Sequence, residues 1–157
     1  MLNTKEMKRI LIIVTLAVFA HLTHAQHSGH YAGSDEEKAF DGNDLVSYFE
    51  SEAPVKGSED YSYDYDGIHL LFSSEENRTK FKNDPDKYIP AYNGWCAIAL
   101  TGGSFVRPDF NEYKIQDGQL LFFEVRAFFN GKTAWERDPD IHKIVADKKY
   151  VELNNKD

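Results

Sequence analysis

The residue with the widest chemical capacity is Cys96, the only cysteine of the 157-residue chain. A thiolate is a strong nucleophile and a good ligand for soft metal ions. Because a single cysteine forms no disulfide within its own chain, Cys96 is a buried apolar side chain, a metal ligand, a reactive thiol or an intermolecular crosslink. A reactive thiol needs a nearby cation or a helix N-terminus, and a helix that begins near Trp95 would provide one.

Three histidines are candidate metal ligands. His69 lies in a strand-like segment and is the imidazole that we expect as a partner of Cys96. The alternative is a histidine on the polar face of a strand with no ligand role. His27 and His30 form a His-x-x-His pair that suits copper or zinc.

The N-terminal residues have the pattern of a signal peptide. Lys5, Lys8 and Arg9 precede an apolar run of 11 residues at 10–20, and the segment 23–25 ends in the small residue Ala25. A bilayer span takes about 20 apolar residues, so we expect cleavage rather than a stable membrane anchor. The protein is therefore expected to be exported, with the periplasm favoured over extracellular release.

The remaining chain divides by composition. Residues 1–25 are the predicted signal peptide, and residues 26–38 are polar and predict a flexible leader. Residues 39–151 predict one folded domain, since a chain of this length can bury a core of its own. Residues 152–157 form a polar tail.

Two β-hairpins are predicted from apolar residues that flank Asp-Gly turns. In the first, tyrosines alternate with polar residues up to Asp66-Gly67, and an apolar run follows at 68–72. In the second, residues 113–115 and 120–123 flank the segment 116–119. Both hairpins are expected to be antiparallel.

Helices are predicted over 73–83, 85–88 and 126–137 and from Pro139 onwards, with the run 95–100 buried as helix or strand. Strands and helices thus form separate clusters along the chain. This arrangement predicts an α+β fold: a single small domain with two antiparallel hairpins and several short helices.

The charge balance limits the expected partners. The chain has 18 Lys and Arg against 26 Asp and Glu, a formal net charge of −8. An acidic surface repels phosphate backbones and anionic membranes, so we expect no nucleic acid partner. The sequence has no Ser-His-Asp order, phosphate-binding glycine loop or His-Glu-x-x-His helix. A transition metal ion or a small molecule remains, and no protein partner is indicated.

Several stretches resemble the YHS domain. They are the apolar strand that ends in Phe72 and leads into Ser-Ser-Glu-Glu-Asn, the segment DPDKY at 84–88, the run YNGWCA at 92–97, and Trp135. The resemblance covers residues 39–151. It looks like the longer, exported branch of the family, which includes selenoproteins.

The resemblance has two implications for metal binding. Short YHS domains that occur with heavy-metal transporters look like cysteine-based metal modules, and their cysteine positions here hold Ser47, Ser73 and Asn77. Since Ser and Asn are poor ligands for copper or zinc, that metal site is expected to be lost. Some exported relatives carry selenocysteine at the position of Cys96, which implies redox or soft-metal chemistry there.

The resemblance also implies a pocket. Asp44 and Tyr48 lie in the entry motif of the family, whose acid and phenol are expected to line a pocket, and Trp95 is the third expected lining residue. Packing of Tyr48 in a core and capping of a turn by Asp44 explain these two residues equally well.

We therefore expect an exported accessory or binding module in transition-metal handling or redox chemistry, acting through Cys96, with copper or zinc as the metal. Two alternatives stay open. One is a thiol-dependent redox enzyme, which requires a depressed thiol pKa and an open pocket. The other is a non-catalytic structural or ligand-binding module with an inert cysteine. The sequence leaves open whether the protein is an enzyme.

Overall fold

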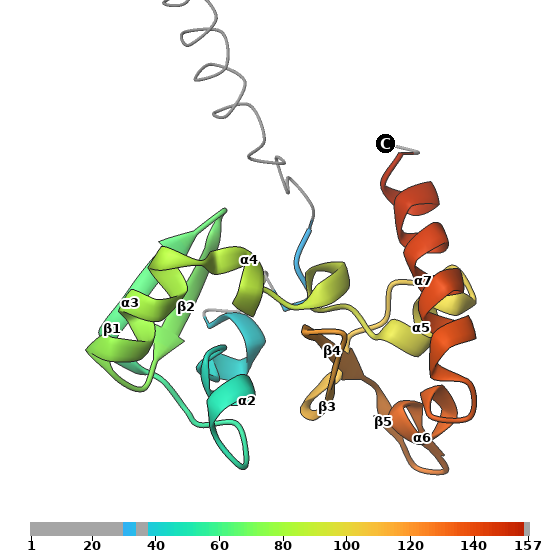
Figure 1. The fold of residues 1–157 in the computed structure, drawn as a ribbon, viewed down its shortest axis with the longest axis horizontal. Coiled ribbons are helices and arrows are strands. Elements are labelled where there is room, and N and C mark those ends of the chain that lie inside the picture. The colour runs from blue at the N-terminus through green and yellow to red at the C-terminus, as the bar shows by residue number, and fades with distance from the viewer. Residues whose placement is uncertain (1–29, 34–37, 156–157) are drawn as a thin grey trace, which may run out of the picture.

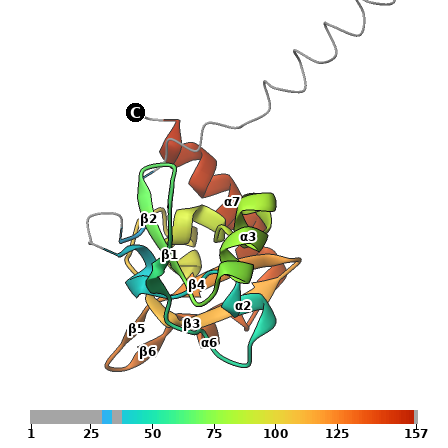
Figure 2. The same cartoon turned by 90° about the vertical axis from the view of Figure 1, so that its left-hand side faces the viewer.

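The computed structural model describes residues 30–33 and 38–155, and within them the chain has the predicted α+β fold. The first half contains η1 (Ala39–Gly42), α2 (Ser47–Glu50), β1 (Ser58–Tyr65), β2 (Ile68–Phe72), α3 (Glu75–Asn83) and α4 (Pro85–Tyr88). The second half contains η2 (Ala91–Gly94), α5 (Ala97–Thr101), β3 (Asp109–Gln116), β4 (Gln119–Phe123), β5 (Val125–Arg126), β6 (Phe129–Asn130), α6 (Gly131–Trp135) and α7 (Pro139–Asn154). Figures 1 and 2 show the two halves on opposite sides of the molecule.

Both predicted hairpins are confirmed. β1 pairs antiparallel with β2, and β3 with β4, each through an Asp-Gly turn. Asp66 and Gly67 have φ of 47° and 80°, and Asp117 and Gly118 have φ of 52° and 76°. Positive φ at both central residues is the geometry of the type I′ turn, which matches the twist of the strands that it joins.

The predicted helix over 126–137 is wrong in its first part. Residues 125–130 form the small β5–β6 hairpin, whose tip residue Phe128 is fully exposed, and the helix α6 begins only at Gly131. The Asn130 side chain accepts a hydrogen bond from the Thr133 N–H at 2.9 Å and so caps the helix start. The helical spacing of Phe128 and Trp135 was therefore coincidental, since only Trp135 is buried.

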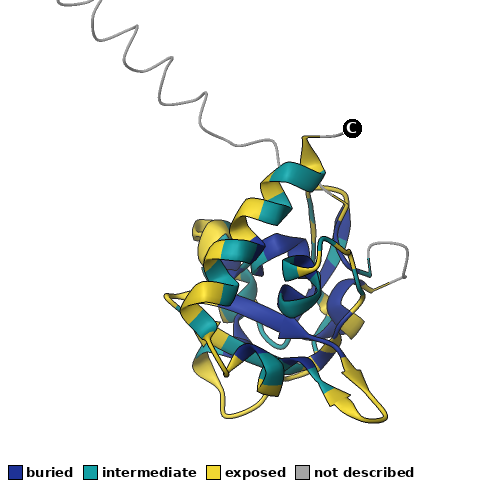
Figure 3. Cartoon of the chain, turned by 90° about the vertical axis from the view of Figure 1, so that its right-hand side faces the viewer, coloured by how far each residue is buried: buried dark blue, intermediate teal, exposed yellow. Residues whose placement is uncertain are grey.

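Strand β4 is buried on both faces and joins two cores. Leu120 and Phe122 belong to the core of the first half, together with Phe40 and Phe72. Leu121 and Phe123 point to the other side and pack in the core of the second half. In Figure 3 the buried residues fill the interior, while the outer face of the C-terminal helix is exposed.

The predicted leader includes two residues that pack on the domain. Tyr31 and Ala32 are buried, and the Ala32 N–H donates to the carbonyl oxygen of Asn93 at 2.9 Å. Residues 26–29 lie outside the described part of the chain. Among the described helices, none has both the length and the apolar character that a membrane span requires.

Gly57 is the tightest point of the first half. A Cβ atom built at Gly57 would lie 2.4 Å from the backbone carbon of Leu71 in β2, and the Gly57 N–H donates to the carbonyl oxygen of Gly42 at 2.8 Å. Gly57 therefore lies between η1 and β2, with no space for a Cβ atom.

We expect the Gly57→Ala substitution to lower the free energy of unfolding by about 1–3 kcal/mol, because the added methyl group overlaps the backbone of β2. Gly102→Ala is the control, since its Cβ would meet only the Ala99 carbonyl oxygen, at 3.4 Å. Urea unfolding of both variants measures the difference. Equal stabilities for the two variants would contradict this packing.

Candidate functional site

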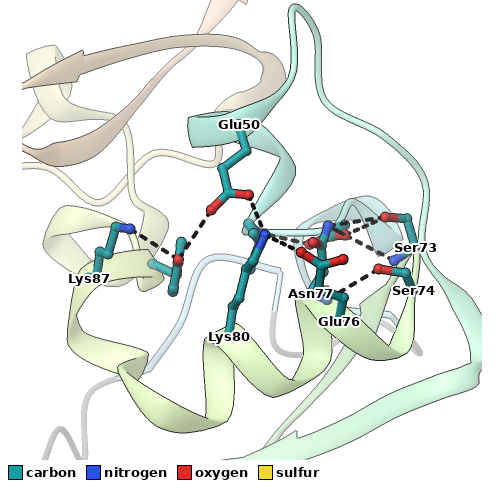
Figure 4. Close-up of polar contacts among 10 residues, drawn as sticks. Glu50, Ser73, Ser74, Glu76, Asn77, Lys80 and Lys87 are labelled. Atoms are coloured by element: carbon teal, nitrogen blue, oxygen red, sulfur yellow. Dashed lines mark hydrogen bonds and ion pairs between the residues drawn. The ribbon is translucent and has the colours of Figure 1, made fainter.

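Asp44 is a fully buried carboxylate with a complete set of hydrogen-bond donors. Its Oδ1 accepts from the Val46 N–H at 2.9 Å. Its Oδ2 accepts from the Ser73 N–H at 2.9 Å, the Ser73 hydroxyl at 2.7 Å and the Asn77 Nδ2 at 2.7 Å. Figure 4 shows Ser73 and Asn77 facing each other at the start of α3. Asp44 thus ties the segment before α2 to the end of β2 and to α3.

The three positions that hold cysteine in metal-binding YHS domains all lie around Asp44. Ser73 and Asn77 bind its carboxylate, and the Ser47 hydroxyl donates to its backbone oxygen at 2.6 Å while accepting from the Val55 N–H at 2.9 Å. Every one of these polar groups is already occupied by a partner within the protein. Across residues 30–33 and 38–155, no three His, Cys, Asp or Glu side chains are arranged to hold a metal ion.

Cys96 is completely buried at the start of α5. Its sulfur accepts a hydrogen bond from the Glu124 N–H at 3.2 Å, and the backbone N–H groups of Ile98 and Ala99 also point at it. Burial raises the pKa of the thiol above its ordinary value, although these three N–H groups act in the opposite direction. The helix N-terminus that we predicted is therefore present, but the thiol is a neutral, buried group.

The predicted histidine partner lies elsewhere. His69 is on the surface of β2, where its Nδ1 lies 2.6 Å from Asp64 Oδ1 and its Nε2 lies 3.1 Å from Glu59 Oε2. The hydrogen bond to Asp64 is the main cause that raises the pKa of His69, and the hydrogen bond to Glu59 acts in the same direction. No hydrogen bond or ion pair in the described part of the chain joins His69 to Cys96.

Of the predicted His-x-x-His pair, His27 lies outside the described residues. The ring of His30 lies 5.7 Å from the ring of Trp95, and the His30 carbonyl oxygen accepts from Trp95 Nε1 at 2.8 Å. Tyr48, expected in a pocket, lies in the core, where its hydroxyl accepts from Asn43 Nδ2 at 2.8 Å and donates to the Phe110 carbonyl oxygen at 2.7 Å.

A cavity of about 580 Å³ lies between the two halves of the fold. Four tyrosines line it: Tyr31, Tyr65, Tyr92 and Tyr150. The segment from α4 to η2 forms one wall, and α7 forms the other. The predicted pocket residues Asp44, Tyr48 and Trp95 are not among those that line this cavity. Its size is within the usual range for sites that bind small organic molecules.

One residue of the cavity wall, Asn93, has a buried polar atom without a partner among the described residues. Asn93 is only 2% exposed, and within the described residues its Nδ2 has no hydrogen-bond partner. Asn93 has a φ of 53°, a left-handed backbone that asparagine tolerates better than most residues. A buried amide that is left unpaired carries a free-energy cost, so an unpaired donor in a cavity points to a ligand that accepts its hydrogen bond.

The cavity is acidic. Asp86 and Asp147 are the charged side chains that line it, and no Lys, Arg or His belongs to its described lining. Asp147 accepts from the Tyr92 hydroxyl at 2.8 Å and is paired with Lys143 Nζ at 2.7 Å. Asp86 has no ion-pair partner among the described residues. The unbalanced charge of the cavity is therefore that of Asp86.

The tyrosine hydroxyls in the cavity are neutral. Burial is the main cause that raises the pKa of all four, assisted at Tyr31 by the charge of Asp66, at Tyr65 by that of Asp86 and at Tyr92 by the hydrogen bond to Asp147. Phenols in this state donate and accept hydrogen bonds but do not act as bases at neutral pH. This site could not be predicted from the sequence because its residues come from five separate segments of the chain.

Comparison with protein families gives one result. Residues 46–92 match the model of the YHS domain family. The match supports the resemblance to the YHS family that the sequence motifs indicated. It extends from the residue before α2 to the middle of η2, and a YHS domain is compatible with a metal-related accessory role. Comparisons with curated proteins and with solved structures found no match.

We expect Cys96 to react slowly with iodoacetamide at neutral pH in the folded protein and rapidly in urea, because burial removes access and raises the thiol pKa. Since the folded state holds the thiol proton more tightly, the stabilising contribution of the neutral thiol is complete below the ordinary thiol pKa and falls as the pH rises above it. Mass spectrometry measures the rate. Fast reaction of the folded protein that copper(I) or zinc suppresses would contradict this result.

Proposed function

We propose that the protein is a non-catalytic accessory module that binds a small organic molecule in the tyrosine-lined cavity between its two halves. The observation that carries this proposal is the buried, unpartnered Nδ2 of Asn93, a residue in the wall of a cavity of about 580 Å³. A cavity that served only as a packing defect would be expected to be apolar and to leave no donor unpaired.

The lining residues favour a ligand with a positive charge. Tyrosine faces attract organic cations, and Asp86 provides a carboxylate without an ion-pair partner in the described structure. An anionic ligand would meet two carboxylates and no cation in the described lining. The ligand class is therefore a small amine with an aromatic or other flat apolar body and a hydrogen-bond acceptor for Asn93.

The lining supports binding rather than catalysis. Cys96 is not among the residues that line the cavity, and no serine, threonine or lysine in its described lining offers a nucleophile. The phenols are held neutral by burial. Without an activated nucleophile or a base of matched pKa, the cavity has the properties of a binding site.

Two predictions from the sequence concern metal or redox chemistry at Cys96 and export of the protein. The YHS resemblance implies transition-metal handling or redox chemistry through Cys96, but the buried position of Cys96 does not favour that role. We also propose that the module acts after export, because residues 1–25 have the pattern of a cleavable signal peptide. The mass of the protein recovered from the periplasm tests cleavage after Ala25.

The ligand class is tested with three probes that share a phenol ring and differ in charge: tyramine, 4-ethylphenol and 4-hydroxyphenylacetate. We expect saturable binding of tyramine by isothermal titration calorimetry, with the acid at least about tenfold weaker, because the amine neutralises Asp86 while the acid is repelled by it. Equal affinities for amine and acid, or no binding of any probe, would reject the proposal.

The matched variants are Asp86→Asn and Asp140→Asn. Both aspartates are exposed and follow a proline at the start of a helix, but only Asp86 lines the cavity. Asp86→Asn should remove most of the preference for the amine, and Asp140→Asn should leave it unchanged. A similar loss in both variants would mean that the preference comes from the net charge of the protein.

A further inference from the structure

The second half of the chain repeats the design of the first, beginning with an unusual turn. The sequences AFDG at 39–42 and AYNG at 91–94 form η1 and η2. In η1, Phe40, Asp41 and Gly42 have φ of 55°, 56° and 69°. In η2, the three corresponding residues at 92–94 have φ of 58°, 53° and 82°. Three consecutive left-handed residues that include a bulky aromatic are rare, because the left-handed backbone costs a non-glycine residue of order 1 kcal/mol or more.

The two large hairpins have the same register. Every paired residue of β3–β4 lies 51 positions after its counterpart in β1–β2, from Ser58 and Asp109 at one end to Phe72 and Phe123 at the other. Each hairpin has strands of eight and five residues, and each has an irregularity after its first paired residue. Even the Asp-Gly turns occupy equivalent positions.

The helices that follow the hairpins, α3 and α6, begin with the same kind of cap and are followed by the same Asp-Pro break. Ser74 caps α3 and Asn130 caps α6, each by accepting from the N–H three residues later. The sequences FKNDPD at 81–86 and WERDPD at 135–140 then place a buried aromatic three residues before an Asp-Pro break. Asp84 has φ and ψ of −151° and 72°, and Asp138 has −157° and 72°.

Within this repeat, Cys96 occupies the place of Asp44. The Asp44 N–H donates to the Val55 carbonyl oxygen at 2.8 Å, and the Cys96 N–H donates to that of Val106 at 3.0 Å. Both side chains are fully buried. The Val46 N–H, just before α2, donates to Asp44, and the N–H groups of Ile98 and Ala99 at the start of α5 lie near the Cys96 sulfur.

Both side chains also accept from the residue that follows the hairpin. Asp44 accepts from the Ser73 N–H at 2.9 Å, and Cys96 accepts from the Glu124 N–H at 3.2 Å. Ser73 and Glu124 are again 51 positions apart, each directly after the last residue of its hairpin. The backbone hydrogen bonds of the two residues therefore coincide, while the bonds from the Ser73 hydroxyl and Asn77 Nδ2 are made by Asp44 alone.

We infer that residues 91–154 form a second unit of the YHS type, in which the Cys96 thiol does the structural work that the Asp44 carboxylate does in the first unit. The family match ends at residue 92 and so covers only the first unit. This assignment gives Cys96 a function of its own: it joins the start of α5 to the end of β4 as a hydrogen-bond acceptor.

The second unit differs from the first in three places, one of which is the shorter helix α6, with five residues where α3 has nine. The β5–β6 hairpin is inserted between β4 and α6, and α7 extends for 16 residues where α4 has four. α7 packs against α5 and supplies Asp147 and Tyr150 to the cavity.

The inference is tested by amide hydrogen exchange in the full chain, measured by NMR for Glu124 and Ser73. Cys96→Ser keeps an acceptor at a helix N-cap, and we expect protection of the Glu124 amide to stay within about threefold of the wild-type value. Cys96→Val has a similar volume but no acceptor, and it should lower Glu124 protection by about five- to tenfold, the effect of one lost hydrogen bond. Ser73 protection should not change in either variant.

Asp44→Asn provides the reciprocal test, and it also answers the question if Cys96→Val fails to fold. Asparagine has one acceptor oxygen where Asp44 uses two, so the substitution should lower protection of the Ser73 or the Val46 amide and leave Glu124 unchanged. If Cys96→Val leaves Glu124 protection intact, or if either substitution lowers both amides equally, the assignment of equivalent roles is wrong. Loss of tyramine binding plays no part in these readouts, so failure of the proposed ligand would not affect them.

Discussion

The fold depends on one interaction that occurs twice: a buried side-chain acceptor before a short helix binds the backbone N–H that follows a hairpin. In the first half the acceptor is the Asp44 carboxylate, and in the second it is the Cys96 sulfur. A strand end that enters the interior leaves its N–H without a strand partner, and a buried N–H without an acceptor is costly. The acceptor solves this problem and at the same time fixes the helix against the hairpin.

This interaction explains what the residues at the candidate metal and thiol positions do in this fold. Ser47, Ser73 and Asn77 occupy the cysteine positions of metal-binding relatives, yet here they are hydrogen-bond partners of Asp44. Cys96 is buried and its thiol pKa is raised. The metal site was expected to be lost at Ser47, Ser73 and Asn77, and soft-metal or redox chemistry was expected at Cys96. Internal hydrogen bonds occupy all four positions. The site that we propose instead is the cavity between the two halves.

Local signals made the hairpins and most helix ends predictable. The Asp-Gly turns specify type I′ geometry within two residues, and the Asp-Pro breaks at 84–85 and 138–139 stop one helix and start the next. The hairpin at 125–130 was missed because the spacing of Phe128, Lys132 and Trp135 also fits one face of a helix. The duplication is visible in the sequence as AFDG with AYNG and NDPD with RDPD, although these matches are too short to stand alone.

The cavity was beyond prediction for a physical reason. Tyr31, Tyr65, Tyr92 and Tyr150 are far apart in sequence, and only the tertiary fold brings them to the wall of one cavity. Burial of Cys96 also depends on contacts with the second hairpin, so its local sequence gave no sign of its accessibility.

The central claim is that the cavity around Asn93 binds an organic amine, and a titration of the isotope-labelled protein with tyramine, followed by NMR, tests it most directly. The account predicts that the side-chain NH₂ signals of Asn93 shift and saturate together with the backbone signals of Asp86 and Tyr150. Saturable shifts confined to another surface, or an Asn93 side chain that does not respond at saturating tyramine, would contradict it.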